Sequence, residues 1–301
     1  MRRFRSKAKR DRGRLLKRMR GQRVKYIAVL PSLITILNGV FGFIAIVFAS
    51  RGAGKGIAGF SYFAIAGYMI LLAMFADMLD GRLARMSQST SSFGGQLDSL
   101  CDMVSFGIAP AFIMLNAMQV HLELTTPLSS GLFHRFIWLA ALAYISCAAL
   151  RLARFNVENE ENEAAHMSFA GLPSPGAAGA IVSLVIFHQE VAPTFDAAIF
   201  VLPFLTLGVA VLMVSRIRYP HVLNVYLRGK QPFGYLMRVL LFLGMVLWLG
   251  MQTAMLLIFL IFAGSGFARW VYLRVHPGRH HLVTANPSVA APSSGHSETH
   301  V

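Results

Sequence analysis

Four aspartates in two pairs are the residues of this sequence whose type and spacing best suit chemistry. Asp77 and Asp80 are three residues apart, and Asp98 and Asp102 are four apart. Residues at these spacings lie on one face of a helix. A turn over residues 82–94 would let two such helices lie antiparallel. The spacing therefore predicts that all four carboxylates converge on one point.

Divalent cations are the simplest compensation for this cluster of negative charge. An aspartate at the centre of a membrane helix costs about 2.5–3.5 kcal/mol, and neighbouring carboxylates repel one another. Two Mg²⁺ or Mn²⁺ ions would balance the charges of four aspartates. Hard cations of this kind prefer oxygen ligands. We therefore expect a metal centre that holds two ions.

The residues between the two pairs suit a substrate that carries phosphate. Gly81 and Gly94 have no side chain where a ligand or a facing helix must come close. Arg85 offers a guanidinium fork that matches phosphate oxygens, and Ser91 could add a hydroxyl donor. Protein-bound Mg²⁺ usually shares its coordination shell with substrate phosphates. The stretch favours phosphate chemistry.

Two other interpretations of the aspartates stay open. A network of ion pairs could hold the two helices together, but Arg82 and Arg85 could neutralise only two of the four acids. The aspartates could also line the proton or cation pathway of a transporter.

The elements that must position these residues are membrane-spanning helices. Hydrophobic residues make up 55% of the 301 residues and charged residues only 14%, against about 25% charged in soluble domains. The apolar residues occur in blocks of about 20, the length that crosses a ~30 Å hydrocarbon core. The composition predicts an all-α, polytopic membrane helix bundle.

We predict about eight spans, with six or seven as alternatives because the fifth is short and the last two are nearly continuous. The chain then divides into a basic N-terminal arm over residues 1–25, a transmembrane domain over residues 26–275 and a disordered tail over residues 276–301. The predicted spans are residues 26–50, 56–79, 95–118, 136–155, 174–188, 195–214, 235–251 and 253–273.

The distribution of charge predicts the orientation in the membrane. The net charge is +15, and residues 1–25 hold thirteen Lys or Arg but one acid. Because the arm lies next to a membrane span, its charge indicates binding to anionic lipid at the membrane surface rather than binding to nucleic acid. The predicted outer loops 51–55, 119–135, 189–194 and 252 hold only three of the 28 basic residues. The positive-inside rule then places both termini and the 81–94 segment on the cytoplasmic side of a bacterial-type inner membrane. The acidic residues 158–163 are expected in a cytoplasmic loop.

The motif from Asp77 to Asp102 resembles the signature of a known enzyme family. It reads Asp-x2-Asp-Gly-x2-Ala-Arg-x8-Gly-x3-Asp-x3-Asp, and it is similar to that of the CDP-alcohol phosphatidyltransferases. The stretches 89–110, 30–38, 151–156 and 171–175 resemble one branch of this family, the membrane-integral phosphatidylserine synthases. The resemblance covers about residues 27–215 and departs from the branch at Gly176, where alanine is more usual.

The resemblance implies a role for each aspartate and for several neighbours. Asp77, Asp80 and Asp98 would bind metal, while Asp102 would bind metal and also act as the general base. The CDP group would be held by residues of the motif and of the first span. These implied CDP contacts are Gly81, Arg85, Ser91, Gly94, Pro31, Thr35 and Asn38.

The same resemblance implies the reaction and the partners. The phosphatidyl group of CDP-diacylglycerol would pass to L-serine, giving phosphatidylserine and CMP, and the enzyme would be a homodimer. Another acceptor, such as glycerol 3-phosphate, inositol phosphate or choline, is the alternative. Arg151 and Arg154, at the cytoplasmic end of the fourth span, could bind the serine carboxylate or could serve the positive-inside rule alone.

Overall fold

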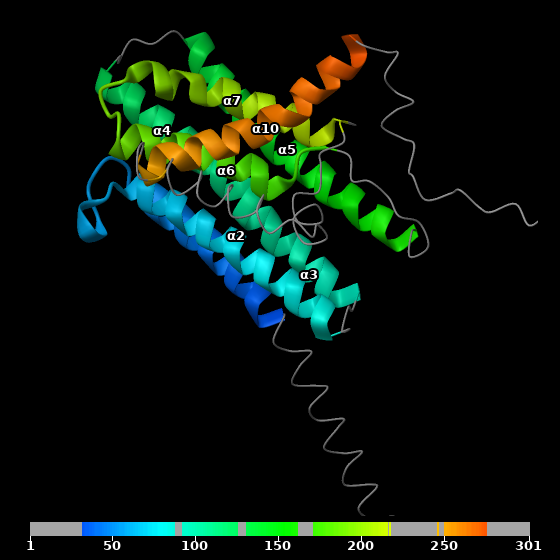
Figure 1. Cartoon of the computed structure of the whole chain (residues 1–301). Coiled ribbons are helices and arrows are strands. Elements are labelled where there is room, and N and C mark those ends of the chain that lie inside the picture. Colours follow the sequence, from blue (N-terminus) through cyan, green and yellow to red (C-terminus); the bar gives the residue numbers. More distant parts are fainter. Residues whose placement is uncertain are drawn as a thin grey trace, which may run out of the picture.

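Helices form almost all of the computed structural model, which describes residues 32–87, 92–125, 131–161, 171–215, 217, 246 and 250–275. Within these ranges no residue pairs into a β-sheet, apart from one isolated bridge between Lys55 and Ser61. The predicted all-α bundle is confirmed (Figure 1). The helices are Ser32–Ala49, α2 (Tyr62–Ser87), α3 (Ser92–Asp102), η2 (Met103–Ile108), α4 (Ala109–Thr125), α5 (Gly131–Glu161), α6 (Ser174–Glu190), α7 (Asp196–Val214) and α10 (Met251–Val275), with a short 3₁₀ turn η1 (Ile57–Gly59).

Six helices of the described chain are long and apolar enough to cross a membrane, counting α3, η2 and α4 as one continuous helix. A seventh helix, α6, has 17 residues and is buried over most of its length. It packs against α2, α7 and α10. A helix that is apolar on all sides belongs inside a bundle. The predicted span 235–251 lies almost wholly outside the described residues.

Several helices extend beyond the predicted spans. The predicted 82–94 turn is wrong, because α2 runs to Ser87 and α3 begins at Ser92. The predicted 119–135 loop is largely helical, since α4 ends at Thr125 and α5 begins at Gly131. The acidic residues at 158, 160 and 161 lie on α5 rather than in a loop. Hydropathy identifies only the segment of a helix that contacts lipid. Residues with high helix propensity, such as Leu, Arg and Glu, extend the helix beyond that segment into water.

Two glycines bring the first described helix close to the helix that carries Asp98 and Asp102. A Cβ on Gly39 would lie 3.1 Å from Cys101 Sγ, and one on Gly42 would lie 2.7 Å from Ser105 Cα. Small residues allow this approach of helix backbones in membranes. The close packing fixes Ser32–Ala49 against α3 and η2.

The small residues of α6 serve packing within the chain. A Cβ on Gly176 would lie 2.6 Å from the Phe262 ring of α10, and Gly179 faces Phe259 in the same way.

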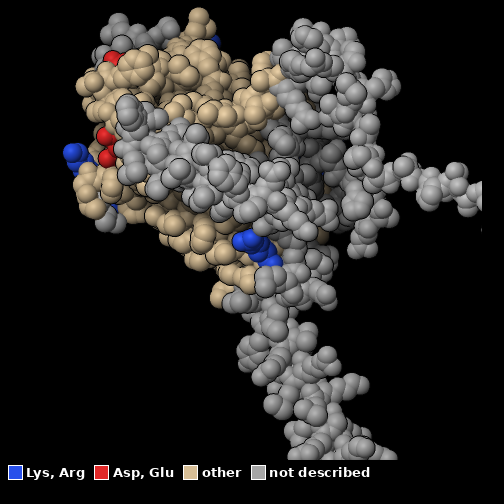
Figure 2. All heavy atoms as spheres, in the orientation of Figure 1, with Lys and Arg blue, Asp and Glu red and all other residues tan. Residues whose placement is uncertain are grey.

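Most of the described surface on one face of the bundle is uncharged, as a lipid-facing surface should be (Figure 2).

Candidate active site

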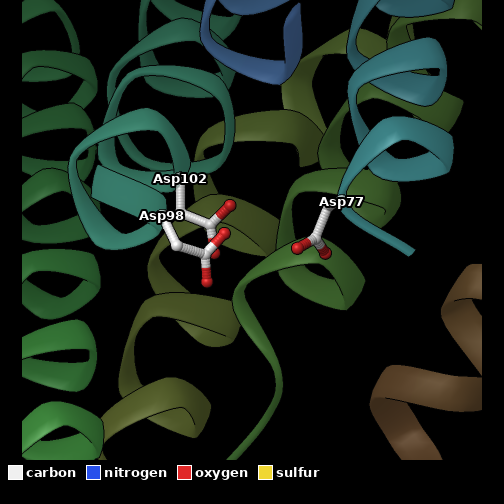
Figure 3. Close-up of side chains that lie close together, drawn as sticks. All are labelled: Asp77, Asp98 and Asp102. Carbon is white, nitrogen blue, oxygen red and sulfur yellow. The ribbon is translucent and has the colours of Figure 1, made fainter. Parts of the chain in front are cut away.

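Carboxylates from α2 and α3 meet near the end of the bundle where α2 ends and α3 begins. One oxygen from each of Asp77, Asp98 and Asp102 lies within 4.8 Å of the other two. Asp98 and Asp102 project side by side from α3, and Asp77 points toward them from α2 (Figure 3). Asp102 is buried, while Asp77 and Asp98 are partly buried. A charge this dense in a sparsely solvated place requires a positive partner.

Asp80 lies beside this group rather than in it. Of the four carboxylates predicted to converge, three have oxygens within 4.8 Å of one another, and Asp80 lies outside this distance. Asp80 is 5% exposed, and its carboxyl group is hydrogen-bonded to the Thr35 side chain. Its charge still interacts with those of Asp77 and Asp98. The bond to Thr35 links this turn of α2 to the Ser32–Ala49 helix.

The donor atoms fit a hard divalent cation. Asp80 Oδ2 and Asp98 Oδ1 are buried and have no hydrogen-bond partner in the described structure. Buried carboxylate oxygens are almost always hydrogen-bonded or bound to metal. Carboxylate oxygens alone are the ligand set of Mg²⁺ and Mn²⁺ rather than of softer metals.

A buried asparagine lies behind Asp102. Asn38 Nδ2 donates a hydrogen bond of 2.9 Å to Asp102 Oδ1. The backbone carbonyl of Asn38 accepts one of 2.8 Å from Ser105 Oγ. Asn38 Oδ1 is buried and has no partner in the described structure. The sequence predicted Asn38 as a nucleotide contact, and the structure places its amide nitrogen on Asp102.

The two arginines of α5 differ in their surroundings. Arg151 is partly buried, and its Nη1 donates a hydrogen bond of 3.1 Å to Ser174 Oγ of α6. Its charge interacts with that of Asp102, and its Nε is buried without a partner in the described structure. Arg154 is exposed. Of the two residues predicted to bind a carboxylate, Arg151 is thus the one that is partly buried within range of the Asp102 charge.

The residues predicted to hold the CDP group are described unevenly. Gly81 is exposed on α2, and a Cβ there would have no heavy atom within 4 Å. Gly94 is part of α3. Arg85 is helical, but its side chain lies outside the described structure, as do Pro31 and Ser91.

Sequence reasoning assigned no role to several residues around the site. Ser99 and Asn156 are hydrogen-bonded to each other and join α3 to α5. Tyr144 is fully buried, and its hydroxyl donates a bond of 2.8 Å to Phe106 O. Asn156 lies in a stretch already singled out for its resemblance, whereas Tyr144 lies in an apolar block and carries no sequence signal.

An open pocket of about 360 Å³ lies between α3 and α5, on a face of α3 other than the one that carries Asp98 and Asp102. The Ser99–Asn156 pair forms part of its wall. The pocket is lined by Gln96, Ser99, Leu100, Met103, Ala149, Leu152 and Asn156.

Comparison with known proteins identifies the family. A family model described as CDP-alcohol phosphatidyltransferase matches residues 28–211. This range is more than half of the chain and contains all four aspartates, Asn38 and Arg151. The chain belongs to the CDP-alcohol phosphatidyltransferase family. The family predicted from the aspartate motif is confirmed.

Several curated relatives of this CDP-alcohol phosphatidyltransferase are named CDP-diacylglycerol–serine O-phosphatidyltransferase, and one, from Methanothermobacter thermautotrophicus, is named archaetidylserine synthase. The protein from Methanocaldococcus jannaschii is 32% identical over 248 residues, which are 82% of this chain and 97% of the relative. One from Helicobacter pylori is 31% identical over 251 residues, or 82% and 93% of the two chains. One from Mycobacterium bovis is 30% identical over 201 residues, or 66% and 63%, so the match spans less than two thirds of that relative's length.

Proposed function

We propose that this protein transfers the phosphatidyl group of CDP-diacylglycerol to L-serine, giving phosphatidylserine and CMP. The observation that carries the proposal is the group of three carboxylates with Asp80 beside it, built from the family motif. The choice of serine is supported by the names of the relatives, which align over 82% of this chain in two cases.

The four aspartates would hold two Mg²⁺ or Mn²⁺ ions. Asp77, Asp98 and Asp102 already lie within reach of a shared ion, and the unpartnered oxygens of Asp80 and Asp98 supply further ligands. When bound, the metal would lower the charge on the diphosphate and stabilise CMP as the leaving group.

Asp102 is our choice for the general base. The serine hydroxyl attacks the β-phosphorus of CDP-diacylglycerol, a new O–P bond forms, and the bond from that phosphorus to CMP breaks. The hydroxyl proton passes to the Asp102 carboxylate. Serine is a weak nucleophile at neutral pH, so a positioned base accelerates attack by about 10²–10⁴-fold. Asp102 is the most buried member of the three-carboxylate group, and Asn38 holds its orientation.

Arg151 would bind the carboxylate of the serine substrate. It lies close enough to Asp102 for their charges to interact, so a serine bound there has its hydroxyl near the base. Its unpartnered Nε is a donor for a carboxylate oxygen, and guanidinium matches carboxylate geometry. Ser174 fixes the other end of the guanidinium. Arg154 is exposed and would serve the positive-inside distribution.

The donor lipid would approach from the cytoplasmic leaflet. The open side of Gly81 leaves room for the CDP group, with Arg85, Ser91, Gly94, Pro31 and Thr35 as further contacts. The acyl chains would stay among lipids beside residues 26–275, and both termini would face the cytoplasm. The working unit would be a homodimer.

An acceptor screen tests the function. Purified protein in lipid vesicles with CDP-diacylglycerol and Mn²⁺ should release CMP when L-serine is added, and a chelator should stop the release until Mg²⁺ or Mn²⁺ is restored. The lipid product should be phosphatidylserine. Release that depends on glycerol 3-phosphate, inositol phosphate or choline would assign another acceptor. Cation flux without CMP release would overturn the enzymatic proposal.

A further inference from the structure

A buried series of hydrogen bonds connects Asp102 to Asn38 of the Ser32–Ala49 helix and to Ser105 of η2. Asn38 Nδ2 donates to Asp102 Oδ1, and Ser105 Oγ donates to the Asn38 carbonyl. Asn38 and Ser105 are both 0% exposed. This series of hydrogen bonds therefore runs from the proposed base, through the first described helix, and back to η2.

We propose that Asn38 is a positioning residue for Asp102, with Ser105 holding Asn38 in place. This inference rests on the proposed function, because it assigns Asn38 to the step in which Asp102 accepts the serine proton. It differs from the expectation drawn from the sequence, in which Asn38 contacts the nucleotide.

The chemistry of the two groups supports this orientation. An ionised carboxylate only accepts hydrogen bonds, and the amide nitrogen of asparagine only donates them. The Asn38–Asp102 bond is therefore charge-assisted, and such bonds are about twice as strong as neutral ones. It engages one oxygen of Asp102 and restricts rotation of the carboxylate. The other oxygen is then presented to the acceptor hydroxyl in one orientation.

The backbone around Asn38 is equally restricted. Gly39 and Gly42 follow it, and a Cβ on Gly39 would lie 3.1 Å from Cys101 Sγ and one on Gly42 would lie 2.7 Å from Ser105 Cα, so the helix backbones are close here. Neither side of this contact can shift without a clash or a gap. The amide of Asn38 is therefore held by packing as well as by Ser105.

Ser105, which bonds to Asn38, lies in a π-helical segment. Residues Met103–Ile108 form η2 directly after Asp102, and the Ala109 N–H bonds to Val104 O in the wider π-helical pattern. Tyr144 of α5 donates to the backbone carbonyl of Phe106, the residue after Ser105. Single π-turns inside α-helices are frequent at functional sites. The residues just beyond Asp102 are thus fixed to two neighbouring helices.

The competing interpretation gives a different kinetic result. Asn38 Oδ1 is buried without a partner in the described structure and could accept a hydrogen bond from the nucleotide. Loss of a nucleotide contact would raise the KM for CDP-diacylglycerol. Loss of a positioning bond would lower kcat, because that bond affects the reaction step rather than binding of the donor.

The experiment compares Asn38→Leu, Ser105→Ala and the double variant in the full-length protein in vesicles. We expect Asn38→Leu to lower kcat by about 10-fold or more, as loss of a hydrogen bond to a charged group would, with the KM for CDP-diacylglycerol changed less than about twofold. Ser105→Ala should lower kcat less. The double variant should match Asn38→Leu, because Ser105 acts through Asn38 and the effects are then not additive.

Ser183→Ala is the matched control. Ser183 is buried in α6 and its hydroxyl bonds only to Ala180 O of its own helix in the described structure. This variant should keep the parental kcat. Mn²⁺ affinity, measured by electron paramagnetic resonance without substrate, should change little in all variants, because every aspartate remains.

Three results would overturn the inference while leaving the proposed function intact. They are a raised KM with unchanged kcat in Asn38→Leu, additive losses in the double variant, or an equal kcat loss in Ser183→Ala. If Asn38→Leu fails to fold, unchanged kcat in Ser105→Ala overturns it alone. Absence of serine-dependent CMP release in the parent protein would instead refute the proposed function.

Discussion

At the scale of residues, Asp102 belongs both to the carboxylate group and to the hydrogen-bond chain behind it. Asp77 and Asp98 share the group but not the bond to Asn38. Asp80 is turned toward Thr35. Four residues of one type therefore have different surroundings, and different surroundings allow different roles at one site.

Replacement of Asp102 by asparagine tests its role as the base. Asp102→Asn keeps the shape of the side chain but removes the proton acceptor and one ligand charge. We expect kcat to fall by at least about 10²-fold, the lower range for a general base. CDP-diacylglycerol should still bind measurably, because three aspartates remain. A variant with nearly normal kcat would exclude Asp102 as the base.

Substitution of the two α5 arginines tests recognition of the acceptor. Arg151→Lys keeps the charge but loses the guanidinium fork, and a charged hydrogen bond contributes about 1.5–3 kcal/mol. The KM for L-serine should rise about tenfold or more, while the KM for CDP-diacylglycerol should change little.

Arg154→Lys is the matched control, because Arg154 is exposed three residues further along α5. It should behave like the parent protein. Serinol, which lacks the carboxylate, should react poorly with the parent protein, and Arg151→Lys should not change its rate of reaction. Equal effects of the two substitutions on the serine KM would remove Arg151 as the carboxylate ligand.

At the scale of elements, the site depends on how closely the Ser32–Ala49 helix approaches α3 and η2. The approach is set by Gly39 and Gly42, and it brings Asn38 to Asp102 and Thr35 to Asp80. The first described helix thus supplies no carboxylate but contacts two of the four.

A methyl group at Gly42 should separate these helices. In Gly42→Ala the new carbon would lie 2.7 Å from Ser105 Cα, so the backbones must move apart. Overpacking of this kind costs about 1–3 kcal/mol, and we expect a lower melting temperature and reduced CMP release. In Gly264→Ala nothing lies within 4 Å of the added carbon. That control should match the parent, and equal losses in both variants would contradict the packing argument.

At the scale of the whole molecule, the order of helices fixes which end of the bundle holds the site. Lys55 precedes the first residue of α2, whereas Asp77 and Asp80 lie toward the last residue of this helix. Lys55 and the aspartates are therefore at opposite ends of α2. The thirteen basic residues of the first 25 precede the helix whose early residue Asn38 contacts Asp102, and Arg82 and Arg85 follow Asp80 on α2. The positive-inside rule then predicts that the aspartates lie at the cytoplasmic face.

Labelling from each side of the membrane tests this orientation. In a background with Cys101 and Cys147 replaced, Lys55→Cys should react with an impermeant thiol reagent applied outside intact cells. Gly81→Cys should react only in inverted vesicles. Both positions are exposed, so accessibility differs only by side. The reverse pattern would place the active site on the outer face.

The sequence by itself determined the class of the protein, because backbone groups in lipid must be satisfied within helices, and apolar blocks of sufficient length therefore become spanning helices. It also determined that Asp98 and Asp102 share a face, because that depends only on helical spacing. The family motif added the chemistry. These conclusions need no knowledge of which helices are neighbours.

Only the tertiary structure decided which side chains meet. Asp80 lies outside the group formed by the other three carboxylates, Asn38 donates to Asp102, and Arg151 is partly buried within range of the Asp102 charge whereas Arg154 is exposed. Each of these outcomes depends on the rotation of a helix against its neighbours. That rotation is set by contacts between residues far apart in the sequence, such as Gly42 with Ser105, and by the π-turn after Asp102, neither of which hydropathy or spacing records.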